Sequence, residues 1–126
     1  MLSCSQRESS NENSNANTAE SQTISATEFQ SKIRATKDPI IIDVRTPGEY
    51  ASGYIDGAIN IDYKNRDFSN KINELDKEAT YFVYCGSGGR SRGAAELMKE
   101  MKFKNVYDLQ GGISQWKSNN LPTRQP

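Results

Sequence analysis

The sequence predicts an α/β protein with a parallel sheet of five strands that is covered by helices on both faces. Short apolar runs alternate along the chain with stretches of helical periodicity, a pattern typical of strands joined by helical crossovers. The run at residues 40–42 is apolar throughout, as in a strand that is buried on both faces. The length of 126 residues suits one folded domain.

Each expected element is a short apolar run or a stretch of helical spacing, and two helix starts carry clear signals. Ser25 followed by Glu28 forms the sequence of a capping box, and Thr46 followed by Pro47 places a cap before a first helical residue. The strands are expected to begin near residue 24 and to cover 40–42, 58–61, 81–84 and 106–109. The helices are expected at 26–33, from 47 to no later than 53, at 68–75, at 91–101 and from 112.

The first residues differ in composition from the rest of the chain. From Ser5 to about Ser21 the sequence is rich in Ser, Asn, Gln and Glu, with almost no large apolar residue. Such a segment buries too little apolar surface to offset the entropy that is lost on ordering. We therefore expect residues 1–22 to be a disordered Ser/Asn-rich tail or linker, and residues 23–126 to form the folded domain.

Composition narrows the possible partners and chemistries. The 16 basic residues balance the 16 acidic ones, so nothing indicates a nucleic acid or an anionic membrane as a partner. No apolar run approaches the length of ~18 residues that a spanning helix requires. The absence of histidine removes Cys–His proteases and most zinc sites, and the sequence implies no metal and no cofactor. Cys4 and Cys85 lie in very different settings, so we expect no disulfide between them.

The most informative segment is the glycine-rich sequence Cys85-Gly86-Ser87-Gly88-Gly89-Arg90-Ser91. It follows an expected strand and precedes an expected helix, so backbone N–H groups converge at the turn and favour negative charge. These surroundings favour the Cys85 thiolate, which is the nucleophilic form. Arg90 adds a cation that is placed to hold an anionic substrate. The alternatives for Arg90 are a solvated surface position or pairing with a carboxylate.

Other residues near the cysteine have structural as well as chemical interpretations. Cys85 could be a buried core residue, but the adjacent glycines favour a functional loop. Ser87 and Ser91 could offer hydroxyls to a substrate, although Ser91 is more simply explained as a helix cap. Asp43 and Arg45 could be an acid–base pair, but we favour a local ion pair that supports the loops.

Three segments together resemble the rhodanese (sulfurtransferase) family. They are DVRTPGEY at 43–50 with GYIDGAINI at 53–61, CGSGGRS at 85–91, and LQGGISQW at 109–116. The resemblance covers residues 24–121, with the motifs in the family's order. The family usually has histidine where Tyr54 stands, and this departure changes a structural turn. The resemblance implies a rhodanese-like five-stranded parallel sheet, with Cys85 as the catalytic residue.

By this resemblance the loop that follows Cys85 binds a small sulfur donor, and Cys85 carries the sulfur as a persulfide. The donor is thiosulfate or a persulfide, and the acceptor is a thiol or cyanide. One alternative is a non-catalytic rhodanese-like module that carries or binds sulfur. A second alternative is a cysteine phosphatase, but four residues separate Cys85 from Arg90 whereas the phosphatases have five.

Cys4 has two interpretations. Leu2-Ser3-Cys4 followed by a Ser/Asn-rich linker is similar to the lipid-acceptor site of bacterial lipoproteins, although no apolar signal segment precedes it in this sequence. A lipid anchor would place the domain at the bacterial cell envelope without spanning the membrane. In the other interpretation Cys4 is an ordinary exposed thiol and the protein is cytoplasmic.

Overall fold

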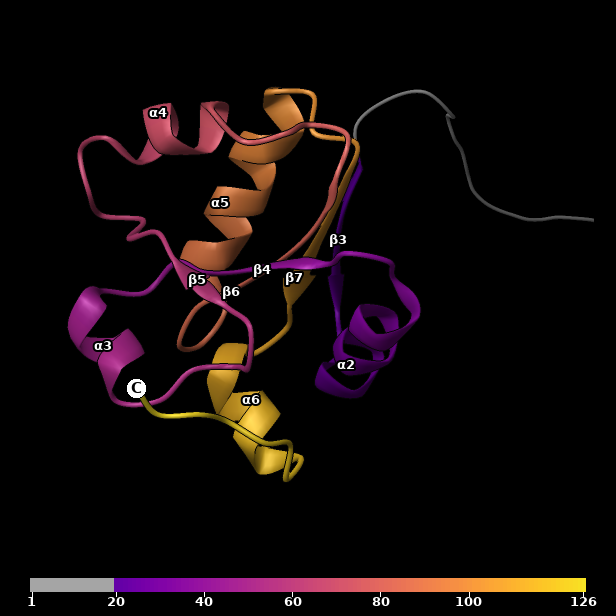
Figure 1. The fold of residues 1–126 in the computed structure, drawn as a ribbon, viewed down its shortest axis with the longest axis vertical. Helices are drawn as coiled ribbons and strands as arrows, with labels where there is room; N and C mark the ends of the chain where they lie inside the picture. Colours follow the sequence, from indigo (N-terminus) through magenta and orange to yellow (C-terminus); the bar gives the residue numbers. More distant parts are fainter. Residues whose placement is uncertain (1–19) are drawn as a thin grey trace, which may run out of the picture.

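A computed structural model describes residues 20–126, which form one parallel sheet between helices (Figure 1). The five strands lie in the order β3-β7-β6-β4-β5, and every pair of neighbours is parallel. The strands are β3 (Glu20–Ile24), β4 (Ile40–Asp43), β5 (Ile59–Asn60), β6 (Thr80–Tyr84) and β7 (Asn105–Leu109). The helices are α2 (Ala26–Ala35), α3 (Pro47–Ala51), α4 (Phe68–Asn73), α5 (Gly89–Glu100) and α6 (Gly112–Ser118). The predicted five-stranded parallel α/β fold is confirmed.

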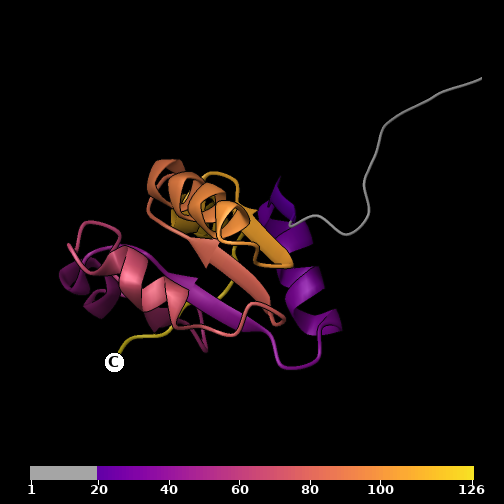
Figure 2. The same cartoon turned by 90° about the horizontal axis from the view of Figure 1, so that it is seen from above.

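Helices cover both faces of the sheet. In Figure 1, α4 and α5 lie above the strands and α2 and α6 below them, and Figure 2 looks onto the face that α4 and α5 cover. Side chains alternate between the two resulting cores along β6. Tyr81 and Val83 pack with α4 and α5, whereas Phe82 and Tyr84 pack with α2 and α6. Burial on both faces explains why the central strands are continuous apolar runs.

The helix α2 is anchored by an aromatic side chain at its centre. Phe29 is fully buried and makes edge contacts with Phe82 at 5.4 Å and Trp116 at 6.2 Å between ring centroids. Complete burial of such a side chain stabilises a fold by about 1.5–3 kcal/mol. The Ser25 hydroxyl caps the helix by accepting from the Glu28 backbone N–H. Within residues 20–126 the Glu28 side chain makes no return bond, so only half of the expected capping box forms.

The first strand begins earlier than its side chains indicate. β3 starts at Glu20, whereas the sequence placed the start of this strand near Ile24. The expected domain boundary after residue 22 stays a prediction. Its five residues pair in register with the whole of β7. An edge strand is held by backbone hydrogen bonds along one side and exposes much of its surface, so it does not need apolar side chains throughout.

Residues 1–19 lie outside the described structure. The expected disorder of the tail and the lipid-acceptor role of Cys4 therefore stay predictions. Within residues 20–126, no helix is both long and apolar enough to cross a membrane. The same residues contain no cluster of three or more side chains of the metal-binding types His, Cys, Asp and Glu that could hold a metal ion.

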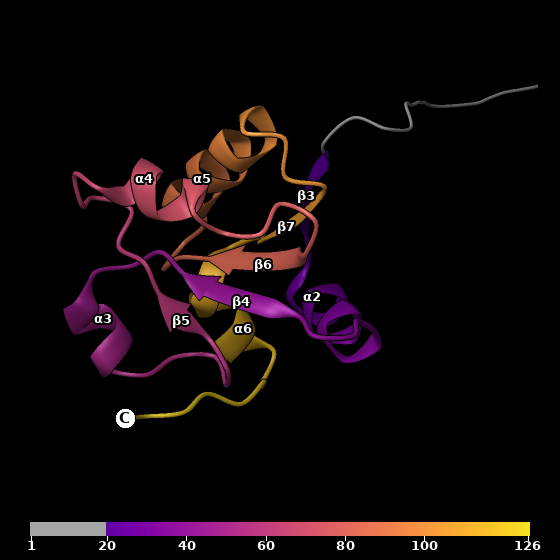
Figure 3. The same cartoon turned by 45° about the horizontal axis from the view of Figure 1, so that its top comes forward.

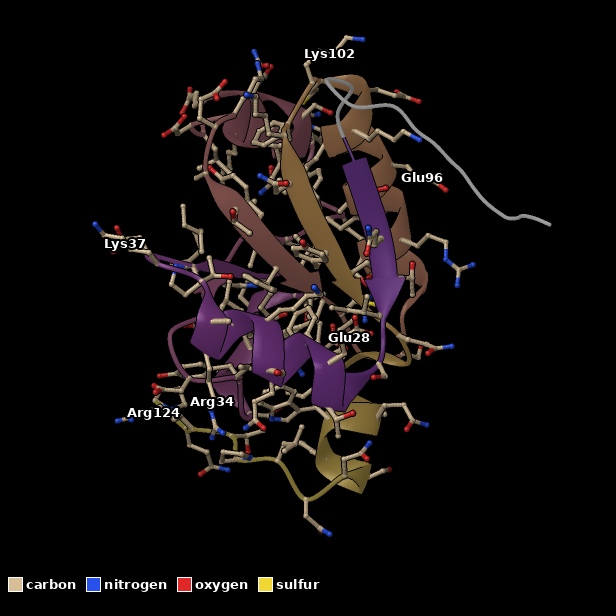
Figure 4. All side chains as sticks on the ribbon, turned by 90° about the vertical axis from the view of Figure 1, so that its right-hand side faces the viewer. Glu28, Arg34, Lys37, Glu96, Lys102 and Arg124 are labelled. Atoms are coloured by element: carbon tan, nitrogen blue, oxygen red, sulfur yellow. The ribbon has the colours of Figure 1, made fainter. Side chains whose placement is uncertain are left out.

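The carboxyl ends of the central strands face one end of the molecule. Figure 3 shows β4 and β6 pointing toward the side on which α3 lies. Charged side chains such as Lys37, Lys102 and Arg124 project outward from the ribbon (Figure 4) and are exposed. Ligands of open parallel sheets bind beyond the carboxyl ends of the strands, and this end carries the cysteine loop.

Candidate active site

Cys85 is the first residue after β6 and lies at the carboxyl end of this central strand. Its side chain belongs to the core cluster on the α4 and α5 face, and the residue is only 1 % exposed. The backbone N–H of Gly88 donates to the Cys85 sulfur across 3.0 Å. The loop therefore turns at least one amide toward the sulfur, as expected for a site that holds a thiolate or a persulfide anion.

The helix after the loop begins earlier than predicted. α5 starts at Gly89, with Gly88 as its N-cap at a φ of 111°, so the expectation that Ser91 caps the helix was wrong. Gly88 takes a left-handed backbone that lets the chain enter the helix two residues sooner. The buried Ser91 hydroxyl instead donates to a carboxylate oxygen of Asp108, and its oxygen lies 3.3 Å from the carbonyl oxygen of Gly88. Ser87, by contrast, is exposed.

Asp108 is a buried carboxylate that the sequence reasoning missed. It lies on β7, is 2 % exposed, and accepts from Ser91 and from the Thr23 hydroxyl at 3.1 Å. Burial raises its pKa above the usual value, although both hydroxyl hydrogen bonds act in the opposite direction. One signal was available, because Asp108 is two residues from the buried Val106 and so points to the same face of the strand.

The motif at residues 109–116 supports the cysteine loop through backbone hydrogen bonds. At the start of α6 the N–H of Ile113 donates to the carbonyl of Cys85 at 2.9 Å, and the N–H of Ser114 donates to that of Gly86 at 3.2 Å. Gly112 has a φ of 64°, and a Cβ atom there would lie 2.5 Å from the Cys85 carbonyl oxygen. Only glycine allows this close approach of the two backbones. The motif thus positions the loop.

Asp43 and Arg45 form a buried ion pair. The Arg45 Nη2 atom lies 2.7 Å from Asp43 Oδ2, and Nε contacts both carboxylate oxygens at 3.0 and 3.1 Å. Arg45 also donates to the carbonyl of Gly53 at 2.6 Å. These contacts tie β4 to the loop after α3, which is the local supporting role favoured from the sequence. Because Arg45 occupies both oxygens of Asp43, this carboxylate is poorly placed for acid–base chemistry.

Arg90 is paired with Glu49 of α3. The two side chains form a bidentate contact, with Nη1 to Oε1 at 2.9 Å and Nη2 to Oε2 at 3.1 Å. Hydrogen bonding from Arg90 is the largest cause that lowers the pKa of Glu49 to about 2. Pairing with a carboxylate was one of the alternatives for Arg90, but the sequence reasoning did not identify Glu49 as the partner. The two residues are 41 positions apart in the sequence, so no local pattern indicates their contact.

Tyr54, at the position where the family usually has histidine, packs against a neighbouring ring. It stacks on Tyr50 with 4.4 Å between ring centroids. Its backbone forms an antiparallel bridge with Arg124, with hydrogen bonds of 2.8 and 2.7 Å. This residue therefore joins the loop after α3 to the last residues of the chain.

The chain belongs to the rhodanese family, since residues 25–119 match the family of the Rhodanese-like domain. It is 39 % identical over 93 residues to thiosulfate sulfurtransferase 16 of Arabidopsis thaliana, covering 66 % of this chain and 78 % of the relative. It is 29 % identical over 103 residues to a sulfurtransferase of Allochromatium vinosum, covering 82 % and 94 %. Among solved structures, a rhodanese-related protein from Thermoplasma volcanium superposes with a TM-score of 0.74 at 28 % identity, covering 83 % of this chain and 99 % of that one.

Proposed function

We propose that the protein is a sulfurtransferase that carries sulfane sulfur as a persulfide on Cys85. The observation that carries this proposal is the hydrogen bond from the Gly88 N–H to the Cys85 sulfur, at the carboxyl end of β6. Relatives at up to 39 % identity, which bear the name thiosulfate sulfurtransferase, support the same class of reaction.

The reaction proceeds in two displacements on sulfur. The Cys85 thiolate attacks the outer sulfur of thiosulfate, a new S–S bond forms, and the bond to the sulfonate sulfur breaks. Sulfite leaves with the electron pair, and Cys85 holds a persulfide anion. A nucleophilic acceptor, cyanide or a thiolate, then attacks the terminal sulfur and releases the Cys85 thiolate. A persulfide donor loads Cys85 in the same way and releases a thiolate.

The loop contributes electrostatic stabilisation. The Gly88 N–H and the N-terminus of α5 point positive charge density toward the sulfur, which favours the thiolate and the persulfide anion. Gly86, Ser87, Gly89 and Arg90 line the remainder of the loop and are the proposed donor-binding residues. Neither displacement requires a proton from a side chain, which agrees with the engagement of Asp43 by Arg45.

One observation favours a second candidate, a module that binds or carries sulfur without turnover. Cys85 is only 1 % exposed, so an acceptor reaches a persulfide on this residue only if the surrounding side chains move, which favours holding the sulfur over releasing it. A phosphatase is less well supported, because it needs a general acid for its leaving group and Asp43 is held by Arg45.

Sulfur loading and turnover separate these candidates. Incubation of the native protein with thiosulfate should add one sulfur atom by intact mass, and cyanide should then remove it as thiocyanate. Cys85→Ser should lose both reactions while keeping its fold, since a serine hydroxyl is a far weaker nucleophile. This variant retains Cys4, so it also controls for reaction at that thiol.

Loading without release to cyanide or a thiol would support the carrier module instead. Full turnover by the Cys85→Ser variant, or hydrolysis of phosphate esters by the native protein, would overturn the assignment.

A further inference from the structure

We propose that Glu49 sets the charge of the sulfur donor: by pairing with Arg90 it makes the Cys85 site select donors with a single negative charge over the thiosulfate dianion. The favoured class is then the persulfides and thiosulfonates. This inference rests on the proposed sulfurtransferase function and narrows its donor.

The position of the Glu49 carboxylate is fixed independently of Arg90. Thr46 donates to Oε1 twice, from its backbone N–H and from its hydroxyl, each at 3.1 Å. In return the Thr46 hydroxyl accepts from the Glu49 N–H, which completes a capping box at the start of α3. The carboxylate is therefore held in place by its own helix, and Arg90 docks onto it.

The ion pair lies directly over the cysteine loop. An ideal Cβ atom on Gly86, the residue after Cys85, would be 3.3 Å from Arg90 Nη2 and 3.8 Å from Glu49 Oε2. Both charges of the pair therefore lie beside Gly86, so an anion that approaches Cys85 past this residue meets the cation and the carboxylate together. The field of such a pair falls off faster than that of a lone cation, so a second negative charge on the donor gains little.

Arg45, the other arginine near the cysteine loop, does not supply a net positive charge for a dianionic donor. Arg45 is 5 % exposed and is bound to Asp43 through three contacts of 2.7 to 3.1 Å. The two arginines and their two carboxylate partners therefore sum to no net charge. Loading from thiosulfate brings a dianion to this neutral group, whereas a persulfide or thiosulfonate brings a monoanion.

Two donors of matched chemistry test the proposal. Thiosulfate and methanethiosulfonate both present a terminal sulfur bonded to an oxidised sulfur. The Cys85 thiolate attacks the terminal sulfur, the S–S bond of the donor breaks, and sulfite or methanesulfinate leaves with the electron pair. Thiosulfate and sulfite each carry one more negative charge than methanethiosulfonate and methanesulfinate. The ratio of their second-order loading rates, measured by intact mass, therefore reports charge selection.

Glu49→Gln removes the carboxylate charge and keeps an oxygen that accepts from Thr46, because glutamine also completes capping boxes. We expect this variant to shift the rate ratio toward thiosulfate by roughly five- to tenfold, and the shift to shrink at high ionic strength. Arg90→Gln should shift the ratio the other way, since it leaves Glu49 uncompensated.

The matched control is Glu78→Gln. Glu78 also forms a salt bridge, with Lys104 at 3.3 Å, but it precedes β6 and so lies at the opposite end of the sheet. The substitution changes the net charge equally and should leave the ratio unchanged. Equal ratios in the native, Glu49→Gln and Arg90→Gln proteins would overturn charge selection while leaving sulfur transfer intact. Failure of the native protein to load sulfur from either donor would overturn the proposed function itself.

Discussion

At the residue scale, a chain of contacts leads from the buried carboxylate of Asp108 to the sulfur of Cys85. Asp108 accepts from the Ser91 hydroxyl, which also lies 3.3 Å from the carbonyl oxygen of Gly88, and the N–H of Gly88 contacts Cys85. Asp108 and Ser91 act on the sulfur only through Gly88. Asp108 and Ser91 are therefore positioning residues for the loop, and burial of the carboxylate has a consequence for stability that depends on pH.

Asp108→Asn should change how stability varies with pH. The pKa of Asp108 is raised in the folded protein above its ordinary value of 3.8, so the folded state binds its proton more tightly than the unfolded state. The contribution of this group to the free energy of unfolding is therefore largest below pH 3.8 and decreases as the pH rises through the folded-state pKa. The stability advantage of the native protein over the variant should shrink between about pH 4 and pH 7 in urea denaturation experiments.

The asparagine variant isolates this effect because its other titratable groups are unchanged, including Arg92 and Glu96, which act on Asp108 through charge. Asparagine can still accept from Ser91 but cannot accept from Thr23 through its NH₂ group, at a cost of about 0.5–1.5 kcal/mol. An advantage that grows with pH would show that the Asp108 carboxylate is stabilised in its charged form.

At the element scale, the turn before α6 determines whether the cysteine loop keeps its shape. The first amides of this helix donate to the carbonyls of Cys85 and Gly86, and Gly112 provides the space for that approach. The loop is thus held between the start of α5 on one side and the start of α6 on the other. Backbone hydrogen bonds thus join the cysteine loop and the motif at residues 109–116 into one structural unit.

Gly112→Ala should disrupt this unit. A methyl group would lie 2.5 Å from backbone atoms of Cys85 and Gly86, and alanine disfavours a φ of 64°. We expect a loss of roughly 1–3 kcal/mol in the free energy of unfolding and slower sulfur loading of Cys85. Gly48→Ala is the control, because a methyl group at this position of α3 would have no other atom within 4 Å. Equal stability and loading in the two variants would contradict a bracing role for the turn.

At the scale of the whole molecule, apolar patterning predicted the architecture because it reports burial directly. The runs at 40–42 and 81–84 became the central strands β4 and β6, which are covered on both faces. The cysteine loop was placed at the end of a strand because its position depends only on the neighbouring elements. These features are local in sequence, so one chain suffices to predict them.

The features that escaped prediction depend on contacts between distant segments. Glu49 meets Arg90, and Asp108 meets Thr23 across 85 positions, and nothing in either local sequence indicates the partner. The helix α5 starts at Gly89, not at Ser91 as predicted, because Gly88 adopts a left-handed backbone. Several glycines in the loop were candidates for that conformation, so the sequence did not identify which one takes it. The start of β3 depends on backbone pairing with β7, to which its polar side chains give little clue.

The boundary of the folded domain is open to a direct test by truncation. A chain that begins at Glu20 keeps all five residues of β3, whereas one that begins at Thr23 loses the three pairs that join Glu20, Ser21 and Gln22 to β7. Loss of these pairs leaves the first half of the β7 edge without its neighbour. We therefore expect the chain 20–126 to match the chain 1–126 in midpoint of urea denaturation and in sulfur loading, and the chain 23–126 to be less stable by about 1–3 kcal/mol. Equal stability of the two truncated chains would place the domain boundary at residue 23, as the composition of the sequence predicts. A lower stability of the chain 20–126 than of the chain 1–126 would show that residues 1–19 contribute to the fold.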